Sequence, residues 1–265
     1  MAGTTNASGF RLMDATLIAL HAAVLAAALL QAATGIGFGV IAGPIILMVM
    51  NSGSAVQVTI LLSLLIAVVL APSLYRQVHK KVLGRLLLGT LVGLPLGILV
   101  FLNVSLDVLM LLAAIAVLLM ALSVSGLLVL PLRKGETSRG EAQNLAIGVL
   151  SGAMSASLAM PGPVAAARMS SLAFPKETIR ATILVMFVFS YSAAFAFQVG
   201  LVGFSQPAWS LTTSLLPATL IGVLIGRLLV ARISERAFRR LIVVVLVATS
   251  LSLFVNSFEG LLANV

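Results

Sequence analysis

Two groups of polar and small residues interrupt long apolar runs of this sequence, and they are the residues best suited to bind a ligand. The first group is Gln31 and Thr34 with the glycines Gly35, Gly37 and Gly39. An amide and a hydroxyl donate hydrogen bonds, and glycine leaves the backbone N–H groups accessible. Neutral donors of this kind, at a point where helix ends meet, favour the binding of an anion over acid–base catalysis.

The second group is Ser155, Ser157, Pro161 and Gly162, followed by Arg168. A single hydroxyl in a membrane helix usually bonds the carbonyl four residues earlier, but for hydroxyls at two matched positions we favour contact with a substrate. Arg168 lies one helical turn into a short apolar segment, where a charge is costly unless it meets water, a partner or a substrate. Two interpretations stay open: a counter-charge for an anion, or a side chain that snorkels to the surface.

The composition assigns the chain to the helical membrane proteins. Its 265 residues are 61% hydrophobic and only 9% charged, whereas soluble domains carry about 25% charged residues. The apolar runs are continuous rather than alternating, which indicates membrane helices. With no cysteine and two histidines, disulfides, thiol catalysis and Cys-based metal sites are excluded. We therefore expect no metal, no cofactor and no catalytic residue.

The glycine spacing predicts a break in the first helix. Gly35, Gly37 and Gly39 are two residues apart, and Gly43-Pro44 follows. Each Gly costs a helix about 1 kcal/mol relative to Ala, and Pro costs about 3 kcal/mol. Close packing of helices through small residues is the alternative, but it uses a spacing of four. Since irregular backbone at membrane depth must be buried in protein or line a cavity, we expect a broken helix that faces a polar site.

The apolar runs form two halves with one pattern, in which an interrupted segment precedes three full runs. We predict an all-α polytopic membrane protein with a single domain over 1–265, made of repeat 1 at about 13–130, a cytoplasmic linker at 131–141 and repeat 2 at about 142–260. The runs lie at about 15–33, 40–50, 55–74, 82–102, 108–130, 144–160, 164–174, 181–198, 209–231 and 241–255.

Small-residue motifs recur in the two halves. A shift of 129 residues maps Gly93-x-x-x-Gly97 on Gly222-x-x-x-Gly226, and both spacings suit close helix contact. A shift of 119 residues maps Gly43-Pro44 on Gly162-Pro163. We therefore expect short helices that start near Gly43 and Pro163 and point their N-termini into one central cavity, as in transporters with inverted repeats.

The basic residues predict the orientation. The net charge of +9 arises mainly in connections, which indicates membrane topology rather than binding of nucleic acid. Each interrupted segment then begins and ends on one side, so it is a broken or re-entrant hairpin, and the three full spans after it give the halves opposite topology. We predict inverted repeats with both termini outside the cytoplasm. The segments placed in the cytoplasm are 75–85, 131–141, 168–180 and 232–240.

Paired broken helices in two halves indicate a secondary transporter that works by alternating access. No acidic residue lies deep in an apolar run, which argues against catalysis by carboxylates inside the membrane. Two alternatives stay open. The first is an anion channel, which would use the same site. The second is a membrane phosphatase acting on a lipid pyrophosphate, to which Met160-Pro161-Gly162-Pro163 with Arg168 bears a weak similarity.

At Thr34-Gly35-Ile36-Gly37-Phe38-Gly39 with Gly43-Pro44, and at the counterpart in the second half, the sequence resembles the sulfite exporter TauE/SafE family of membrane permeases. The second half carries Ser, Ala and Pro where this pattern has glycines. The resemblance covers nearly the whole chain and implies export of sulfite or of organosulfonates such as sulfoacetate, across the cell inner membrane. The expected partners are a small anionic substrate and the lipid bilayer, with proton coupling and a homodimer as hypotheses and no nucleic acid.

Overall fold

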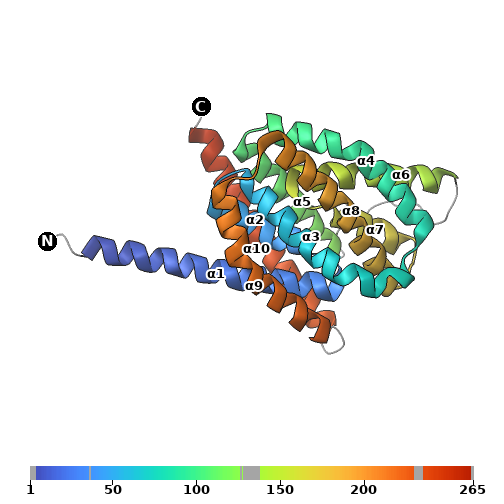
Figure 1. Cartoon of the computed structure of the whole chain (residues 1–265), viewed down its shortest axis with the longest axis horizontal. Helices are drawn as coiled ribbons and strands as arrows, with labels where there is room; N and C mark the ends of the chain where they lie inside the picture. The colour runs from blue at the N-terminus through green and yellow to red at the C-terminus, as the bar shows by residue number, and fades with distance from the viewer. Residues whose placement is uncertain (1–3, 36, 126, 128–137, 230–234, 264–265) are drawn as a thin grey trace.

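The computed structural model describes residues 4–35, 37–125, 127, 138–229 and 235–263, which form helices and no strand. Figure 1 shows one bundle, from which the N-terminal part of the first helix extends. Most of the predicted linker 131–141 lies outside the described residues. The helices are α1 (Thr4–Thr34), α2 (Phe38–Met50), α3 (Ser54–Leu74), η1 (Tyr75–Gln77), α4 (Lys80–Asn103), α5 (Leu106–Ser125), α6 (Ser138–Leu158), α7 (Gly162–Ser171), α8 (Lys176–Val202), α9 (Gln206–Leu229) and α10 (Glu235–Ala263).

Seven helices of the described chain are long and apolar enough to cross a membrane. At 1.5 Å per residue, α2 and α7 are only about 20 Å and about 15 Å long, which is short of the roughly 30 Å hydrocarbon core. The protein is therefore an all-α, multi-pass membrane protein, as the composition predicts. The candidate spans are Thr16–Thr34, Ser54–Gln77, Lys80–Asn103, Leu106–Ser123, Lys176–Val202, Gln206–Leu228 and Val243–Gly260.

Two helix breaks separate α1 from α2 and α6 from α7. They share a left-handed residue after the first helix but differ before the second, where Gly37 has φ 134° and Pro161 has φ −71°. The residue after each first helix is left-handed: Gly35 has φ 83° and Ala159 has φ 58°. The Gly35 N–H donates to the Gln31 carbonyl at 2.7 Å, and the Ala159 N–H donates to the Ser155 carbonyl at 3.2 Å. One shift of 124 residues maps the whole of the first break on the second.

The prediction that the first short helix starts near Gly43 is wrong. The helix α2 begins at Phe38, and Pro44 lies inside it. The backbone turns at Gly35 and Gly37, which have positive φ, whereas Gly43 does not. A buried proline in a helix loses one hydrogen bond without ending the helix, because packing around it holds the backbone. Gly162-Pro163 does start α7, so the shift of 119 residues does not describe the two breaks.

The helix that precedes each break packs on a full helix from the other half. In this arrangement α1 lies against α9 and α6 lies against α4, while α3 packs on α8 and α5 on α10. A Cβ atom added to Gly93 or Gly97 would overlap the carbonyl of Val149 or Ala153 on α6. Added to Gly222 or Gly226, it would lie 2.5 Å from the carbonyl oxygen of Leu25 or Leu29 on α1. The predicted close helix contact at both motifs is confirmed.

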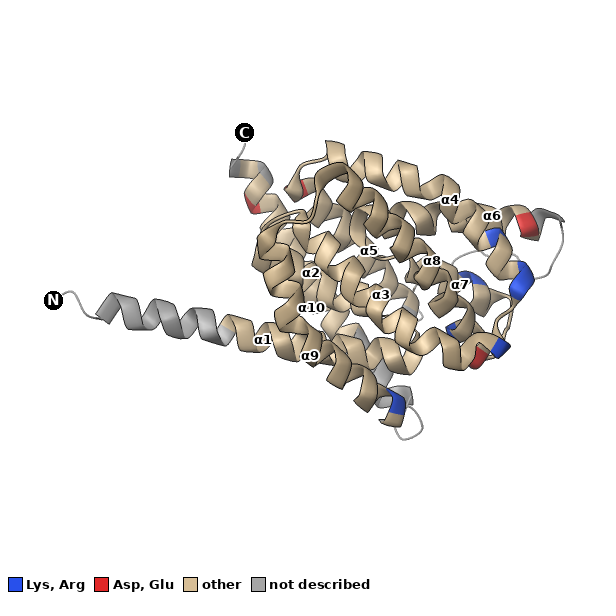
Figure 2. Cartoon of the chain, in the orientation of Figure 1, with Lys and Arg blue, Asp and Glu red and all other residues tan. Residues whose placement is uncertain are grey.

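The described charges are divided between the two ends of the bundle. The basic end carries the α3–α4 connection, the starts of α6 and α8 and the ends of α7 and α9, and Figure 2 shows the Lys and Arg residues gathered there. Lys81 and Arg85 pair with Glu141 on α6 across this end, at 3.2 Å and 3.0 Å. At the opposite end, Asp107 lies beside Gly260 near the end of α10. This asymmetry agrees with the positive-inside pattern of the sequence.

Two glycines of α4 give a matched test of the packing. We expect Gly93→Ala to lower the free energy of unfolding by about 1–3 kcal/mol, because the added methyl meets backbone that cannot rotate away. Gly84 has open space at its Cβ position, so Gly84→Ala should be neutral or stabilising by up to about 1 kcal/mol. Thermal unfolding in detergent measures both, and equal effects of the two changes would contradict the assigned contact.

Candidate functional site

The two breaks meet at a small cavity. The first residues of α2 and of α7 border it, together with two side chains of α8. Its volume of about 10 Å³ is close to the minimum that holds one water molecule. None of the described residues that line it is charged. They are Gln31, Gly37, Gly39, Val40, Ala159, Met160, Gly162, Pro163, Phe187 and Tyr191.

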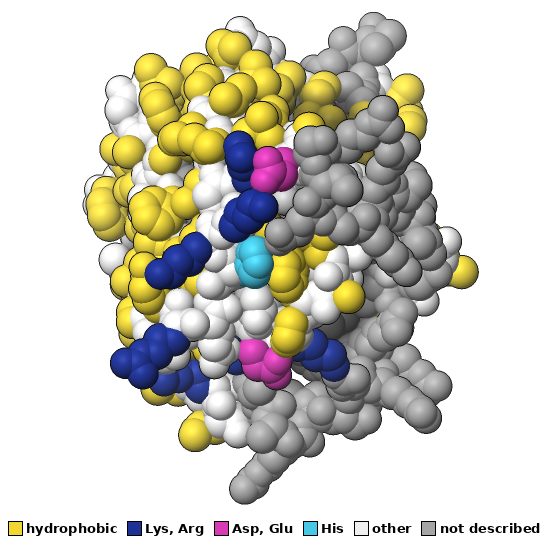
Figure 3. All heavy atoms as spheres, turned by 90° about the vertical axis from the view of Figure 1, so that its right-hand side faces the viewer, with side chains coloured by type: hydrophobic (Ala, Val, Ile, Leu, Met, Phe, Trp, Pro, Cys, Tyr) yellow, Lys and Arg dark blue, Asp and Glu magenta, His cyan; other side chains and the backbone are white. Residues whose placement is uncertain are grey.

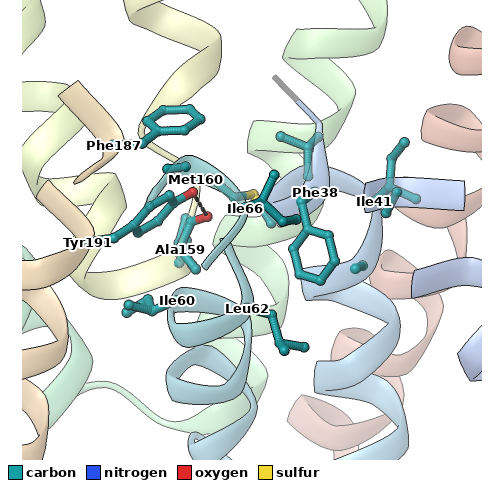
Figure 4. Packing of buried hydrophobic residues seen from close by; sticks show 14 of the residues in the cluster. Phe38, Ile41, Ile60, Leu62, Ile66, Ala159, Met160, Phe187 and Tyr191 are labelled. Carbon is teal, nitrogen blue, oxygen red and sulfur yellow. Dashed lines mark hydrogen bonds between the residues drawn. The ribbon is translucent and has the colours of Figure 1, made fainter. Parts of the chain in front are cut away.

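The two breaks touch at Gly39 and Ala159. A Cβ atom added to Gly39 would overlap the carbonyl oxygen of Ala159 and would lie 3.4 Å from the hydroxyl of Tyr191. That hydroxyl donates to the same Ala159 oxygen at 2.9 Å, the bond drawn in Figure 4. Only glycine at position 39 permits this approach of backbone to backbone. Both residues line the cavity, so this contact forms part of its wall.

Gln31 ties α1 to α2 across the first break. Its side chain is fully buried, and its Oε1 accepts a hydrogen bond from the Phe38 N–H at 3.2 Å. Its Nε2 donates to the Ser63 carbonyl on α3 at 3.5 Å. Gln31 therefore satisfies a backbone donor of the first turn of α2 that has no acceptor within the helix.

The electrostatics of the cavity favour an anion. The first N–H groups of a helix lack intrahelical acceptors, and the helix dipole places partial positive charge at that end. The starts of α2 and α7 both border the cavity, so the two positive ends add there. The described lining has no carboxylate that would oppose an anion. The prediction that two helix N-termini share one cavity agrees with this geometry.

The predicted hydroxyls lie away from the cavity lining. Thr34 Oγ1 donates to the Leu30 carbonyl at 2.9 Å, and Ser157 Oγ donates to the Ala153 carbonyl at 2.8 Å. Both bonds run back four residues along the helix, the usual arrangement in membrane helices. Ser155 Oγ is buried and has no hydrogen-bond partner. Gly35 and Pro161 shape the breaks without lining the cavity.

Arg168 is fully buried but does not line the cavity. Its Nε donates to Asn144 Oδ1 at 2.6 Å, and its Nη2 donates to the Gly140 carbonyl at 3.2 Å. The guanidinium therefore ties the end of α7 to the start of α6. In this conformation it does not snorkel to water, since none of its surface is exposed. A contact of Arg168 with a substrate stays a prediction.

Sequence reasoning missed three groups at the breaks, all from α8. Tyr191 holds the Ala159 carbonyl, and Gln198 Nε2 donates to the Ala156 carbonyl at 2.6 Å. Arg180 Nη2 donates to the carbonyl of Ala32 in the last turn of α1. The sequence does carry a signal for Tyr191, because it is one of only two tyrosines and lies inside an apolar run.

Comparison with known proteins gives one family. The family model for Sulfite exporter TauE/SafE matches residues 20–253. This range covers both breaks and all of the cavity lining. No curated protein and no solved structure matches the chain.

The two tyrosines give a matched test of the contact at the second break. We expect Tyr191→Phe to lower the free energy of unfolding by about 1–3 kcal/mol, because it leaves the buried Ala159 carbonyl without its donor. Tyr75 is 58% exposed in η1, and Tyr75→Phe should change stability by less than about 0.5 kcal/mol. Thermal unfolding in detergent measures both, and a Tyr191→Phe protein as stable as the Tyr75→Phe protein would show that the bond contributes nothing.

Proposed function

Since the chain belongs to the sulfite exporter TauE/SafE family, a family of membrane transporters and not of enzymes, we propose that it exports sulfite or small organosulfonates such as sulfoacetate. The cavity between the two breaks is the proposed binding site. Gln31, Gly37 and Gly39 contribute from the first break, and Gly162 from the second. The family and the seven candidate spans support transport of sulfur anions.

The observation that carries the proposal is the convergence of two helix N-termini on one uncharged cavity. Backbone N–H groups at helix starts bind sulfur and phosphorus oxyanions without any basic side chain. Met160 and Phe187 give part of the lining an apolar character, which suits the carbon chain of an organosulfonate. The residues therefore fit both a bare oxyanion and one with a short apolar substituent.

The volume of the cavity indicates a closed conformation. About 10 Å³ holds one water molecule and is too small for sulfite. The breaks must therefore part before an anion binds. Because Gly39 and Ala159 both line the cavity and their backbones touch, we propose that separation of these two residues opens the site in the transport cycle.

Alternating access through inverted repeats is the proposed mechanism. The helix ends at the two breaks match under a shift of 124 residues, and the packing is reciprocal: α1 lies on α9 as α6 lies on α4. Each broken hairpin would then move with a full helix of the other repeat. We place the basic end in the cytoplasm of a bacterial-type inner membrane and both termini outside it. Proton coupling and a homodimer remain hypotheses.

Flux into proteoliposomes tests the proposal. We expect saturable, protein-dependent transport of sulfite and sulfoacetate, with acetate as the carboxylate control. Flux that rises in proportion to concentration without saturation would favour an anion channel. Absence of flux for every sulfur anion, from a protein that is folded and inserted, would contradict the proposed function.

A glycine pair tests the site. We expect Gly39→Ala to reduce the transport rate by about tenfold or more, because the methyl displaces one break from the other, and misplacement of about 1 Å can cost a hundredfold. Gly53→Ala is the control, since its added Cβ would meet the Phe101 ring at an ordinary 3.5 Å. Size-exclusion profiles and thermal unfolding establish that both variants fold. A Gly39→Ala protein with the normal rate would remove this cavity from the mechanism.

A further inference from the structure

Two arginines lie at the basic end on either side of the last turn of α1. Arg180, in the second turn of α8, donates from Nη2 to the Ala32 carbonyl. On α9, Gly226 is packed so closely on α1 that an added Cβ would lie 2.8 Å from the Cβ of Ala32, and Arg227 is the next residue. Arg180 is therefore held at Ala32, and the backbone of the exposed Arg227 lies close to the same residue. Figure 3 shows the wider basic face of the molecule, where Lys and Arg side chains gather.

The charges of this arginine pair are not compensated within the described chain. Arg227 follows Gly226, which packs on Ala32, and Arg180 donates to the Ala32 carbonyl, so the two positive residues lie near one another. No carboxylate of the described residues forms an ion pair with either of them. At the same end, Lys81 and Arg85 differ in this respect, since they share Glu141. A second guanidinium beside a first is unfavourable unless an anion lies between them.

One donor of Arg180 is buried and unused. Its Nε makes no hydrogen bond to the part of the chain that the structure describes, although the rest of the side chain is only half-buried. A buried N–H without an acceptor destabilises the structure that contains it. An oxyanion placed between the two guanidinium groups would supply that acceptor and would be bound by charge-assisted hydrogen bonds.

The carbonyl of Ala32, in the last turn of α1, does not need a positively charged hydrogen-bond donor. Under the shift of 124 residues, Ala32 corresponds to Ala156 in the second half. The Ala156 carbonyl accepts its hydrogen bond at 2.6 Å from Gln198, a neutral amide of the same helix α8. A neutral side chain therefore satisfies the equivalent carbonyl, so the hydrogen bond to Ala32 does not by itself account for an arginine at position 180.

We propose that Arg180 and Arg227 form a second anion site, separate from the cavity, which takes a small oxyanion at the basic end before it reaches the two breaks. The identity of this anion as the cargo rests on the proposed function. The site is adjacent to the first break: a Cβ added to Gly35 would lie 2.8 Å from Cγ of Arg180. The arginine pair therefore lies beside the residue that follows α1.

Equilibrium binding of sulfite to the full chain, purified in a non-ionic detergent, tests the site. Arg227 makes no hydrogen bond in the described structure, so Arg227→Gln removes charge without removing a structural contact. We expect this change to weaken sulfite binding about fivefold to tenfold at low salt, with a smaller effect at high salt. Arg76→Gln is the control, because Arg76 is an exposed arginine of η1 at the same end; it should change the affinity by less than about twofold.

The outcomes separate this site from the proposed function. If the wild-type protein transports sulfite and Arg227→Gln keeps its affinity and half-saturating concentration, the second site is refuted and the function stands. If the protein binds sulfite through Arg227 but transports no sulfur anion, the function fails and the site stands. No sulfite binding in the millimolar range would refute the site directly.

A competition experiment with a lipid tests whether the bound anion is a free oxyanion or a lipid headgroup. Phosphatidylglycerol carries a phosphate with the same charge-assisted chemistry as a free oxyanion. We expect vesicles of this lipid not to displace sulfite from the wild-type protein. Displacement that is lost in Arg227→Gln would assign the site to a lipid headgroup and overturn the proposal for a cargo anion.

Discussion

The structure depends on one constraint, which is that irregular backbone inside a membrane must find its hydrogen-bond partners within the protein. Each break leaves carbonyls at the end of one helix and N–H groups at the start of the next. The described side chains that meet these groups come mainly from α8: Arg180 at Ala32, Gln198 at Ala156 and Tyr191 at Ala159. Helix α8 therefore holds both breaks.

The two breaks solve the same problem with different residues. The first uses glycines, for which positive φ carries little cost. The second places Ala159 in the left-handed region, where a residue with a Cβ costs of order 1–3 kcal/mol. The Tyr191 hydroxyl bonds the carbonyl of that same residue, so a long-range contact supports the strained position. The departure from a glycine-rich pattern in the second half is thus accompanied by a compensating side chain.

The spans could be predicted from the sequence because length and hydropathy are local properties. Six of the seven candidate spans match the predicted full runs, and the seventh, Thr16–Thr34, is the first part of the predicted interrupted segment. The position of the first break was harder to predict from the sequence. The sequence alone does not distinguish Gly35 and Gly37 from Gly43. Only the packing of the folded chain determines that the first two take positive φ while Gly43 stays helical. Tyr191 and Arg180 were missed because each acts on a residue far away in the sequence, 32 positions in one case and 148 in the other. The inverted arrangement of the repeats and the binding roles of Gln31, Ser155 and Arg168 stay predictions.

The separation of full charges from the cavity has a physical consequence for a carrier. A site that must release its anion on every cycle benefits from donors strong enough to bind and weak enough to let go. Helix N-termini carry about half an elementary charge each, less than a guanidinium. Arg168 is held by Asn144 and the Gly140 carbonyl, outside the lining, so it adds no full charge in direct contact with the cavity. Weak dipoles at the cavity and full charges at the basic end are therefore consistent with collection of anions on one side and their release from the middle of the membrane.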